Sequence, residues 1–176
     1  RRLSAPGYES HLAVNTLAPY VLITGLRPLL SREPGTMPSM IVNITSGVVN
    51  REKALDVDAL VDPPQIGGLT GAYATSKVAL DSMTRGLADG LRADGILIRS
   101  VDPGGTKTPM IGDGVPLPFR ILGPLVFKTP DKSAADVVAS ASPEALEGRT
   151  GVFVAKQRVK NGSKAAQDPA TQTRVL

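Results

Sequence analysis

Apolar positions in the first third of the chain follow a helical pattern and then a strand pattern. Across residues 8–30, leucine and valine side chains recur with the spacing of one helix face. Pro19 and Pro28 are expected to kink or fray this helix, and the Pro and Gly residues of segment 31–38 end it. Residues 39–45 (SMIVNIT) are short, β-branched and largely apolar, which predicts a buried strand of the parallel type.

A polar loop and a second helix-strand pair follow. Residues 47–71 form a loop of a length that is uncommon unless it covers a site. The next predicted helix contains Tyr73 and Lys77 and ends before Gly95, a natural helix stop. Residues 96–101 (ILIRSV) predict a second buried strand.

The last part of the chain predicts one more helix and one more strand. Residues 106–130 are rich in apolar side chains, Pro and Gly without a steady period, which predicts a mobile cover or a cluster of short turns. Asp131 is expected to cap a helix that runs to about residue 141. A third strand is predicted at 151–155, and the polar residues 158–176 are expected to be a frayed tail.

The alternating order of helices and strands predicts an α/β fold, in which helices cover a parallel sheet. Folds of this kind carry their sites at the carboxyl ends of the strands. Ser46 follows the first predicted strand, Pro103 and Gly104 follow the second, and Tyr73 opens the helix between them. We therefore expect these features to converge on one edge of the sheet.

Length and composition fit one globular domain and exclude several classes of function. The 176 residues suffice for one core, and 41% apolar with 20% charged residues is typical of a folded domain. Aromatic residues make up only 3% and no Lys or Arg run follows one face, so nucleic-acid binding is not expected despite the net charge of +4. No apolar run reaches membrane-spanning length. The absence of cysteine excludes disulfides and thiolate chemistry and fits a cytoplasmic location.

Other site chemistries have few residues to support them. His11 is the only histidine, so a histidine-based metal site lacks ligands and no metal site is predicted. A Ser-His-Asp hydrolase would also need His11, and the chain has no Gly-x-Ser-x-Gly motif. Asp56, Asp58 and Asp62 share one loop, where a solvated acidic surface is favoured over a divalent-cation site.

Tyr73 and Lys77 form the pair with the clearest chemistry. Four residues apart on a helix, they lie on the same face, one turn from each other. A phenol, with an ordinary pKa of about 10, is a poor base at neutral pH, and a neighbouring ammonium group stabilises the phenolate. The pair is therefore suited to proton transfer at an alcohol or carbonyl oxygen. Taken alone, the spacing is common by chance and favours an ordinary helix that carries an exposed lysine.

Four motifs, in this order along the chain, resemble those of the short-chain dehydrogenase/reductase family. Asn15 lies in HLAVNTLA, Ser46 ends IVNITS, the Tyr73/Lys77 pair follows, and PGGTKT over residues 103–108 comes last. The resemblance implies a Rossmann-type, doubly wound parallel sheet between layers of helices. It also implies hydride transfer between a nicotinamide cofactor, NAD or NADP, and a small-molecule alcohol or carbonyl substrate.

The resemblance implies a role for each matched residue. Tyr73 is expected to be the general acid/base, Lys77 to assist it and hold the nicotinamide ribose, and Ser46 to bind the substrate oxygen. Asn15 is expected to position a water of the proton relay. The cofactor-binding residues implied are Asn15, Tyr73, Lys77, Pro103, Gly104, Thr106 and Thr108.

Each matched residue also has a structural alternative. Ser46 could be a strand-end hydroxyl that caps a turn. Asn15 could be a surface residue of its helix, and Thr106 and Thr108 could be ordinary loop residues. These alternatives must all hold together to defeat the joint interpretation.

One departure from the family pattern concerns the phosphate loop. The family's glycine-rich loop lies well before its Asn, whereas only residues 1–14 precede Asn15 here, and Gly112-Asp-Gly114 lacks the third glycine of the fingerprint. The amino-terminal half of the domain is therefore expected to be missing. Residues 1–157 would form an incomplete three-layer αβα domain, the carboxyl-terminal part of a longer enzyme.

A second departure is the long interval between Ser46 and Tyr73. Residues 56–60 and the segment that begins with GVFV at 151 resemble the retinol dehydrogenase-like branch, which implies an apolar alcohol, an aldehyde or another carbonyl compound. The resemblance further implies homo-oligomers formed through the helices of Asn15 and Tyr73. The alternative is a truncated, non-catalytic chain that acts only through those contacts. Exposed sheet edges and helix faces are expected to make the isolated chain poorly soluble or partly disordered.

Overall fold

A four-stranded sheet forms the centre of the computed structural model, which describes residues 4, 7–60, 71–107 and 127–176. The strand order is β1-β2-β3-β4; β1, β2 and β3 are parallel, and β4 is antiparallel to β3. The positions of the three strands predicted from the sequence are confirmed within one or two residues, but the first of them is half-buried along most of its length rather than buried. The strands span Ser39–Ile44 (β1), Ile96–Asp102 (β2), Val152–Ala155 (β3) and Arg158–Lys160 (β4).

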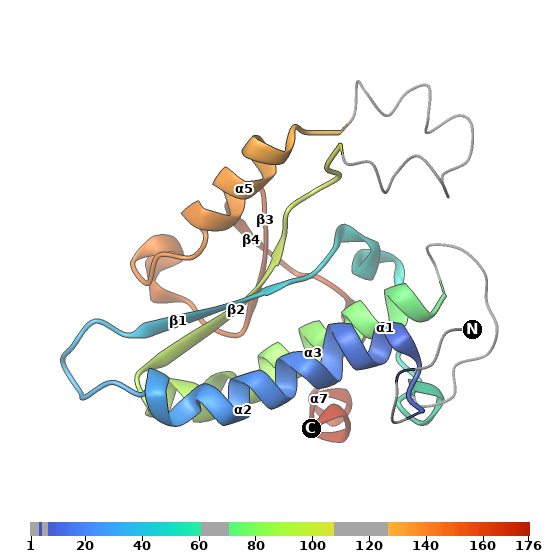
Figure 1. Ribbon diagram of the computed structural model, residues 1–176, viewed down its shortest axis with the longest axis horizontal. Helices are drawn as coiled ribbons and strands as arrows, with labels where there is room; N and C mark the ends of the chain where they lie inside the picture. The colour runs from blue at the N-terminus through green and yellow to red at the C-terminus, as the bar shows by residue number, and fades with distance from the viewer. Residues whose placement is uncertain (1–3, 5–6, 61–70, 108–126) are drawn as a thin grey trace.

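Helices lie on both faces of this sheet, as Figure 1 shows, with α2 and α3 on one side and α5 on the other. The arrangement is a partial form of the predicted three-layer α/β fold. None of the helices in the described segments is long and apolar enough to cross a membrane. The main helices are α1 (Ser10–Leu12), α2 (Ala18–Leu30), α3 (Ala72–Ala93) and α5 (Pro130–Ala139).

The amino-terminal helix is interrupted, although not at a proline. A π-helical turn, η1 (Ala13–Leu17), separates α1 from α2. Pro19 lies in the first turn of α2, which continues directly from the π-helical turn, and Pro28 lies inside the same helix. The irregular turn therefore comes just before Pro19 and contains Asn15.

The main core forms where α3 packs on the sheet. Leu80, Met83 and Leu91 of α3 meet Ile96 and Ile98 of β2, all almost fully buried. Every residue of β2 except the last is buried, because β1 and β3 flank this strand and α3 covers it. A strand covered in this way needs apolar residues on both faces, which explains the apolar run at residues 96–101.

Turn chemistry fixes the ends of two helices. Gly95 has φ +70°, and a Cβ there would lie 2.7 Å from the carbonyl oxygen of Arg32, so only glycine fits this turn between α3 and β2. The N-cap of α5 is Thr129, whose side chain accepts from the Lys132 N–H. The sequence prediction of Asp131 as the cap is therefore wrong by two residues; Asp131 lies in the first turn.

The carboxyl-terminal segment 158–176 is not frayed, contrary to the expectation from its polar composition. It forms β4 and two short helices, α6 (Lys164–Gln167) and α7 (Pro169–Val175). The Ser163 hydroxyl donates to the Glu52 carbonyl at 2.7 Å, and Ala165 and Ala166 are buried. Both helices pack against α3, and Ala165 and Ala166 of α6 share a core cluster with Val78 of α3. The domain boundary predicted at residue 157 therefore does not separate a tail from the fold.

Candidate active site

Tyr73 and Lys77 lie in the first turns of α3, on neighbouring turns as predicted. The Lys77 Nζ atom lies 5.9 Å from the centroid of the Tyr73 ring. The same ammonium donates to the Ile44 carbonyl at the end of β1, with an Nζ–O distance of 2.8 Å. Burial lowers the pKa of Lys77 from its ordinary value. Lys77 therefore links the start of α3 to the carboxyl end of β1 and keeps its ammonium beside the phenol.

Asn15 belongs to the π-helical turn and bonds to the helix that carries Tyr73. Its Nδ2 donates to the Ser76 Oγ at 3.0 Å, and that hydroxyl donates to the Tyr73 carbonyl at 2.8 Å. Thr16, the next residue, donates to the Ser76 carbonyl at 2.9 Å. Asn15 is therefore not a solvated surface residue, and π-helical turns are often found at functional sites. Ser76 is a member of this network that the sequence analysis missed.

Ser46 lies just beyond β1, two residues after the acceptor of Lys77. It is the N-cap of the short helix η2 (Gly47–Arg51), and its Oγ accepts from the Val48 N–H at 3.4 Å. The capping alternative that the sequence left open describes this contact. Capping of η2 and binding of a substrate oxygen are compatible roles for Ser46, since a hydroxyl that accepts one long hydrogen bond can still donate its proton to a ligand oxygen.

The Pro103-Gly104 turn follows β2. Ile44 at the end of β1 pairs with Val101 near the end of β2, so the two strands end at the same edge of the sheet. Gly104 has φ +76°, and its N–H donates to the Asp102 Oδ1 at 2.9 Å. The space that a Cβ would take at Gly104 borders the Lys128 side chain, whose Nζ would lie 3.5 Å from it, so the turn brings an ammonium group close to the glycine backbone. Ser46 and the Pro103-Gly104 turn therefore follow strand ends at the same edge of the sheet, as predicted, and the bond from Lys77 to the Ile44 carbonyl ties the start of α3 to that edge.

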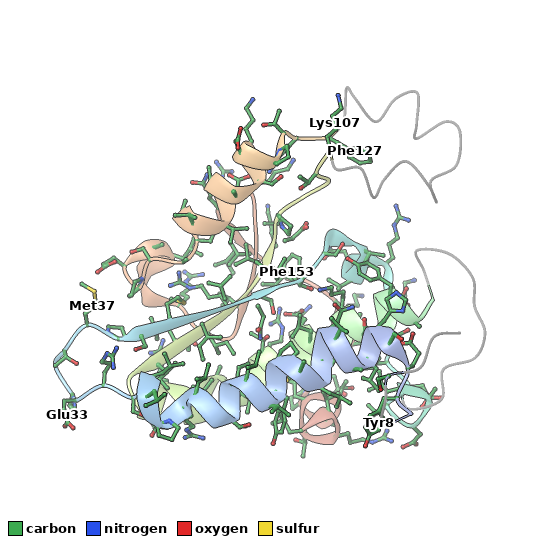
Figure 2. The ribbon with its side chains drawn as sticks, in the orientation of Figure 1. Tyr8, Glu33, Met37, Lys107, Phe127 and Phe153 are labelled. Carbon is green, nitrogen blue, oxygen red and sulfur yellow. The ribbon has the colours of Figure 1, made fainter. Side chains whose placement is uncertain are left out.

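Thr106, which follows this turn, bonds to α5 and to the turn itself. Its hydroxyl lies 2.7 Å from the Ser133 Oγ of α5 and donates to the Gly104 carbonyl at 3.2 Å. Lys107 and Phe127 lie close together at the two ends of the intervening segment (Figure 2), which a backbone hydrogen bond between Lys107 and Lys128 ties together. Thr108, the other predicted cofactor residue, and most of the predicted apolar cover lie outside the described residues.

An open cleft of about 380 Å³ lies between α2 and β1 and includes two of the site residues in its lining. Asn15 and Lys77 contribute polar groups, while Leu22, Leu26 and Ile41 are among the apolar side chains. The cleft therefore offers an apolar surface next to an amide and an ammonium group, a combination typical of small-molecule sites.

These residues fit part of a nicotinamide dinucleotide. The Lys77 ammonium has donors beyond the one that Ile44 uses. These donors suit a ribose hydroxyl at the nicotinamide end of such a cofactor. The sequence has no glycine-rich loop for the adenine end. Chemically, the site can hold a hydroxyl or carbonyl oxygen beside the Tyr73 phenol.

Comparisons with known proteins identify the relationship. The family described as short chain dehydrogenase matches residues 65–115, a stretch that includes Tyr73 and Lys77. Human polyprenol dehydrogenase is 30% identical over 90% of this chain and 49% of its own length. Bovine retinol dehydrogenase 12 is 32% identical over 85% of this chain and 46% of its own length.

A solved structure agrees with the sequence relatives. A short chain dehydrogenase from Salmonella enterica has a TM-score of 0.57 at 27% identity, covering 84% of this chain and 51% of that chain. The chain spans about half the length of the curated relatives it matches. Over the part that it shares with them, these matches support a relationship of the chain to the short-chain dehydrogenase family, with relatives among the retinol dehydrogenases.

Proposed function

We propose that this chain carries the catalytic residues of an NAD(P)-dependent oxidoreductase that interconverts an alcohol and a carbonyl compound. The observation that supports the proposal most strongly is the connected set of Asn15, Ser76, Tyr73 and Lys77, anchored to the end of β1. The similarity to the short-chain dehydrogenase family supports the nicotinamide cofactor, which supplies or accepts the hydride. The choice between NAD and NADP is left to the experiment below.

In the reduction direction, Tyr73 donates its phenolic proton to the substrate oxygen as that oxygen gains negative charge. The Lys77 ammonium, 5.9 Å from the ring centroid, stabilises the phenolate that remains. Ser46 would donate a hydrogen bond to the same substrate oxygen. Asn15 would hold a water that returns a proton toward Lys77. Oxidation of an alcohol uses the same groups in reverse.

The substrate class that we propose is an apolar alcohol or aldehyde. Two related proteins are named for retinol and polyprenol, both long apolar alcohols. The largely apolar lining of the cleft beside Lys77 is compatible with such a molecule. We further propose a cytoplasmic location and a homo-oligomer formed through α2 and α3. The second candidate, a non-catalytic chain acting through those helices alone, is favoured only if cofactor binding fails.

Titration of the purified chain with NADH and with NADPH, followed by nucleotide fluorescence, tests the cofactor. We expect saturable binding of at least one nucleotide with a dissociation constant in the micromolar range, about 8 kcal/mol. Substitution K77M should weaken the binding at least tenfold, because it removes the ammonium donor. The absence of binding by either nucleotide would contradict the proposal for this chain and favour the non-catalytic alternative.

Substitution Y73F tests the acid/base role. It removes one oxygen from a half-buried ring, so the fold should be kept while turnover of an apolar aldehyde falls by about 10²–10⁴-fold. Circular dichroism and the nucleotide titration should match the unsubstituted chain. The control is Y20F, the same chemical change on α2 away from the site, which should keep full activity. Substantial turnover by Y73F would contradict the role of Tyr73.

A further inference from the structure

The only histidine of the chain lies against the proposed acid/base residue. The ring centroids of His11 and Tyr73 are 5.9 Å apart, and the ring planes make an angle of 75°. This is the edge-to-face arrangement that aromatic pairs prefer. The two residues are 62 positions apart in sequence, and they meet because α1 packs on the start of α3.

A buried carboxylate holds the His11 ring in this place. Glu9 is 5% exposed and is the N-cap of α1, with its Oε2 accepting from the Leu12 N–H at 3.0 Å. Its Oε1 lies 2.8 Å from the His11 Nδ1. Burial raises the pKa of Glu9, but the hydrogen bonds from Leu12 and His11 outweigh it, so the net pKa is lowered and the carboxylate stays charged. The charged oxygen therefore has a fixed position from which to orient the imidazole.

An imidazole and an ammonium group lie beside the Tyr73 ring in the described structure. They are the His11 imidazole and the Lys77 ammonium, each 5.9 Å from the centroid of the ring. Tyr73 lies in the first turn of α3, where a side chain has no preceding helical turn to restrict its rotamer. The orientation of the phenol therefore depends on tertiary neighbours, and these two groups are among them. Lys77 is itself fixed by the Ile44 carbonyl, and His11 by Glu9.

We propose that His11 is a positioning residue for Tyr73 and that Glu9 fixes His11 for this purpose. The imidazole packs against the phenol ring and limits its rotation, which keeps the hydroxyl close to Lys77. His11 itself neither gives nor takes a proton in the reaction. The proposal rests on the acid/base role of Tyr73 for its meaning in catalysis, while the contact itself can be tested in the absence of activity.

The first test measures the Tyr73 side chain by NMR in the full chain. We expect unequal Hα–Hβ couplings, which report one dominant rotamer, and a nuclear Overhauser effect between the Tyr73 ring and His11. Substitution H11A should move the two couplings toward equal, averaged values, whereas H11F, which keeps an aromatic ring, should leave them unequal. Unchanged couplings in H11A would overturn the proposal, whether or not the chain is an active enzyme.

A second pair of variants separates Glu9 from general stability. Glu9→Gln leaves only one oxygen for the two donors, so the Overhauser effect between His11 and Tyr73 should weaken by about half or more. The control is Arg149→Ala, which breaks an exposed ion pair with Glu147 and should change neither signal. An undiminished effect in Glu9→Gln would show that Glu9 does not hold the ring.

The kinetic test uses the split between kcat and KM. H11A should lower kcat by about tenfold, with KM and the nucleotide dissociation constant within about twofold, because only the alignment of the phenol is lost. H11F should recover kcat to within about threefold of the unsubstituted chain. Equal loss in H11F and H11A would assign the effect to the imidazole's chemistry and overturn the positioning role. If the unsubstituted chain shows no turnover, the proposed function fails. The NMR couplings then test by themselves whether His11 restricts the Tyr73 side chain.

Discussion

Arg99 lies in the middle of β2 with its guanidinium group buried among backbone carbonyls. The side chain is fully shielded, and each of its five N–H donors has a carbonyl acceptor in the turn that follows α5. We expect R99M to lower the free energy of unfolding by about 3 kcal/mol or more, because several buried carbonyls lose their donors. R99K should be intermediate, and urea denaturation measures both. The acceptors are the carbonyls of Ser140, Ser142, Pro143, Ala145 and Arg149.

The matched control for Arg99 is Arg149→Met. The Arg149 side chain reaches only the exposed Glu147 carboxylate, so its loss should change the stability by less than about 0.5 kcal/mol. Equal stability of R99M and the unsubstituted chain would show that water replaces the guanidinium without cost.

The residue scale also shows which parts of the site the sequence could reveal. Tyr73 and Lys77 are close in sequence, so their spacing alone predicts a shared helix face. Ser46 and Gly104 could be placed because each follows a strand that its short apolar run predicts. The bonds of Ser76 to Asn15 and of Glu9 to His11 could not be predicted as parts of the site. They depend on how α1 and the π-helical turn pack on α3, which no local pattern encodes.

The carboxyl-terminal elements are held on α3 partly by a buried ion pair. Asp81 is fully buried, and its Oδ2 lies 3.4 Å from the Arg85 Nε, while Arg85 donates to the Asn161 carbonyl at 2.9 Å. Burial raises the pKa of Asp81, an effect that Arg85 and Ser100 only partly offset. A carboxyl group with a raised pKa in the folded state favours folding at low pH. That stability is lost as the pH rises from about 4, the ordinary value for aspartate, through the raised pKa.

The loss of stability on removing Arg85 should therefore depend on pH. We expect R85M to lower the free energy of unfolding at pH 7 by about 3 kcal/mol, because it leaves a buried carboxylate without its partner. The loss should be smaller at pH 5, where Asp81 takes up a proton more readily. The double variant D81N/R85M should recover most of the stability at pH 7. A loss in R85M that does not change with pH and is not recovered by D81N would contradict this account.

The same elements explain why the sequence prediction failed after residue 157. Composition alone favours a frayed tail there, since the segment is polar and small. The fold of this segment depends on Ser163 and Asp168, which cap α6 and α7, and on two alanines that pack closely against the core. Strands and long helices were predictable, because each carries its own apolar period. Helices of fewer than eight residues are determined by caps and tertiary contacts instead.

At the scale of the whole molecule, the apolar surface of α2 is continuous with the cleft beside β1. Val21 and Leu29 are 65% and 74% exposed, and Leu22 and Leu26 are both exposed and part of the cleft lining. Within the described residues, β1 pairs only with β2, so its other edge presents free backbone groups. Both features favour association, in agreement with the homo-oligomer proposed above and with the poor solubility expected from the sequence.

Charged substitutions on this face test the association. We expect sedimentation velocity to show oligomers of the unsubstituted chain, and the variant V21K/L29K to shift them toward monomers, because lysine on the buried face of an interface is costly. The free energy of unfolding per chain should change little, since both side chains are exposed in the single chain. The control is V138K, at a 70% exposed position of α5 on the other side of the sheet, which should leave the oligomers intact. Oligomers that persist in V21K/L29K and dissociate in V138K would place the contact on α5 instead.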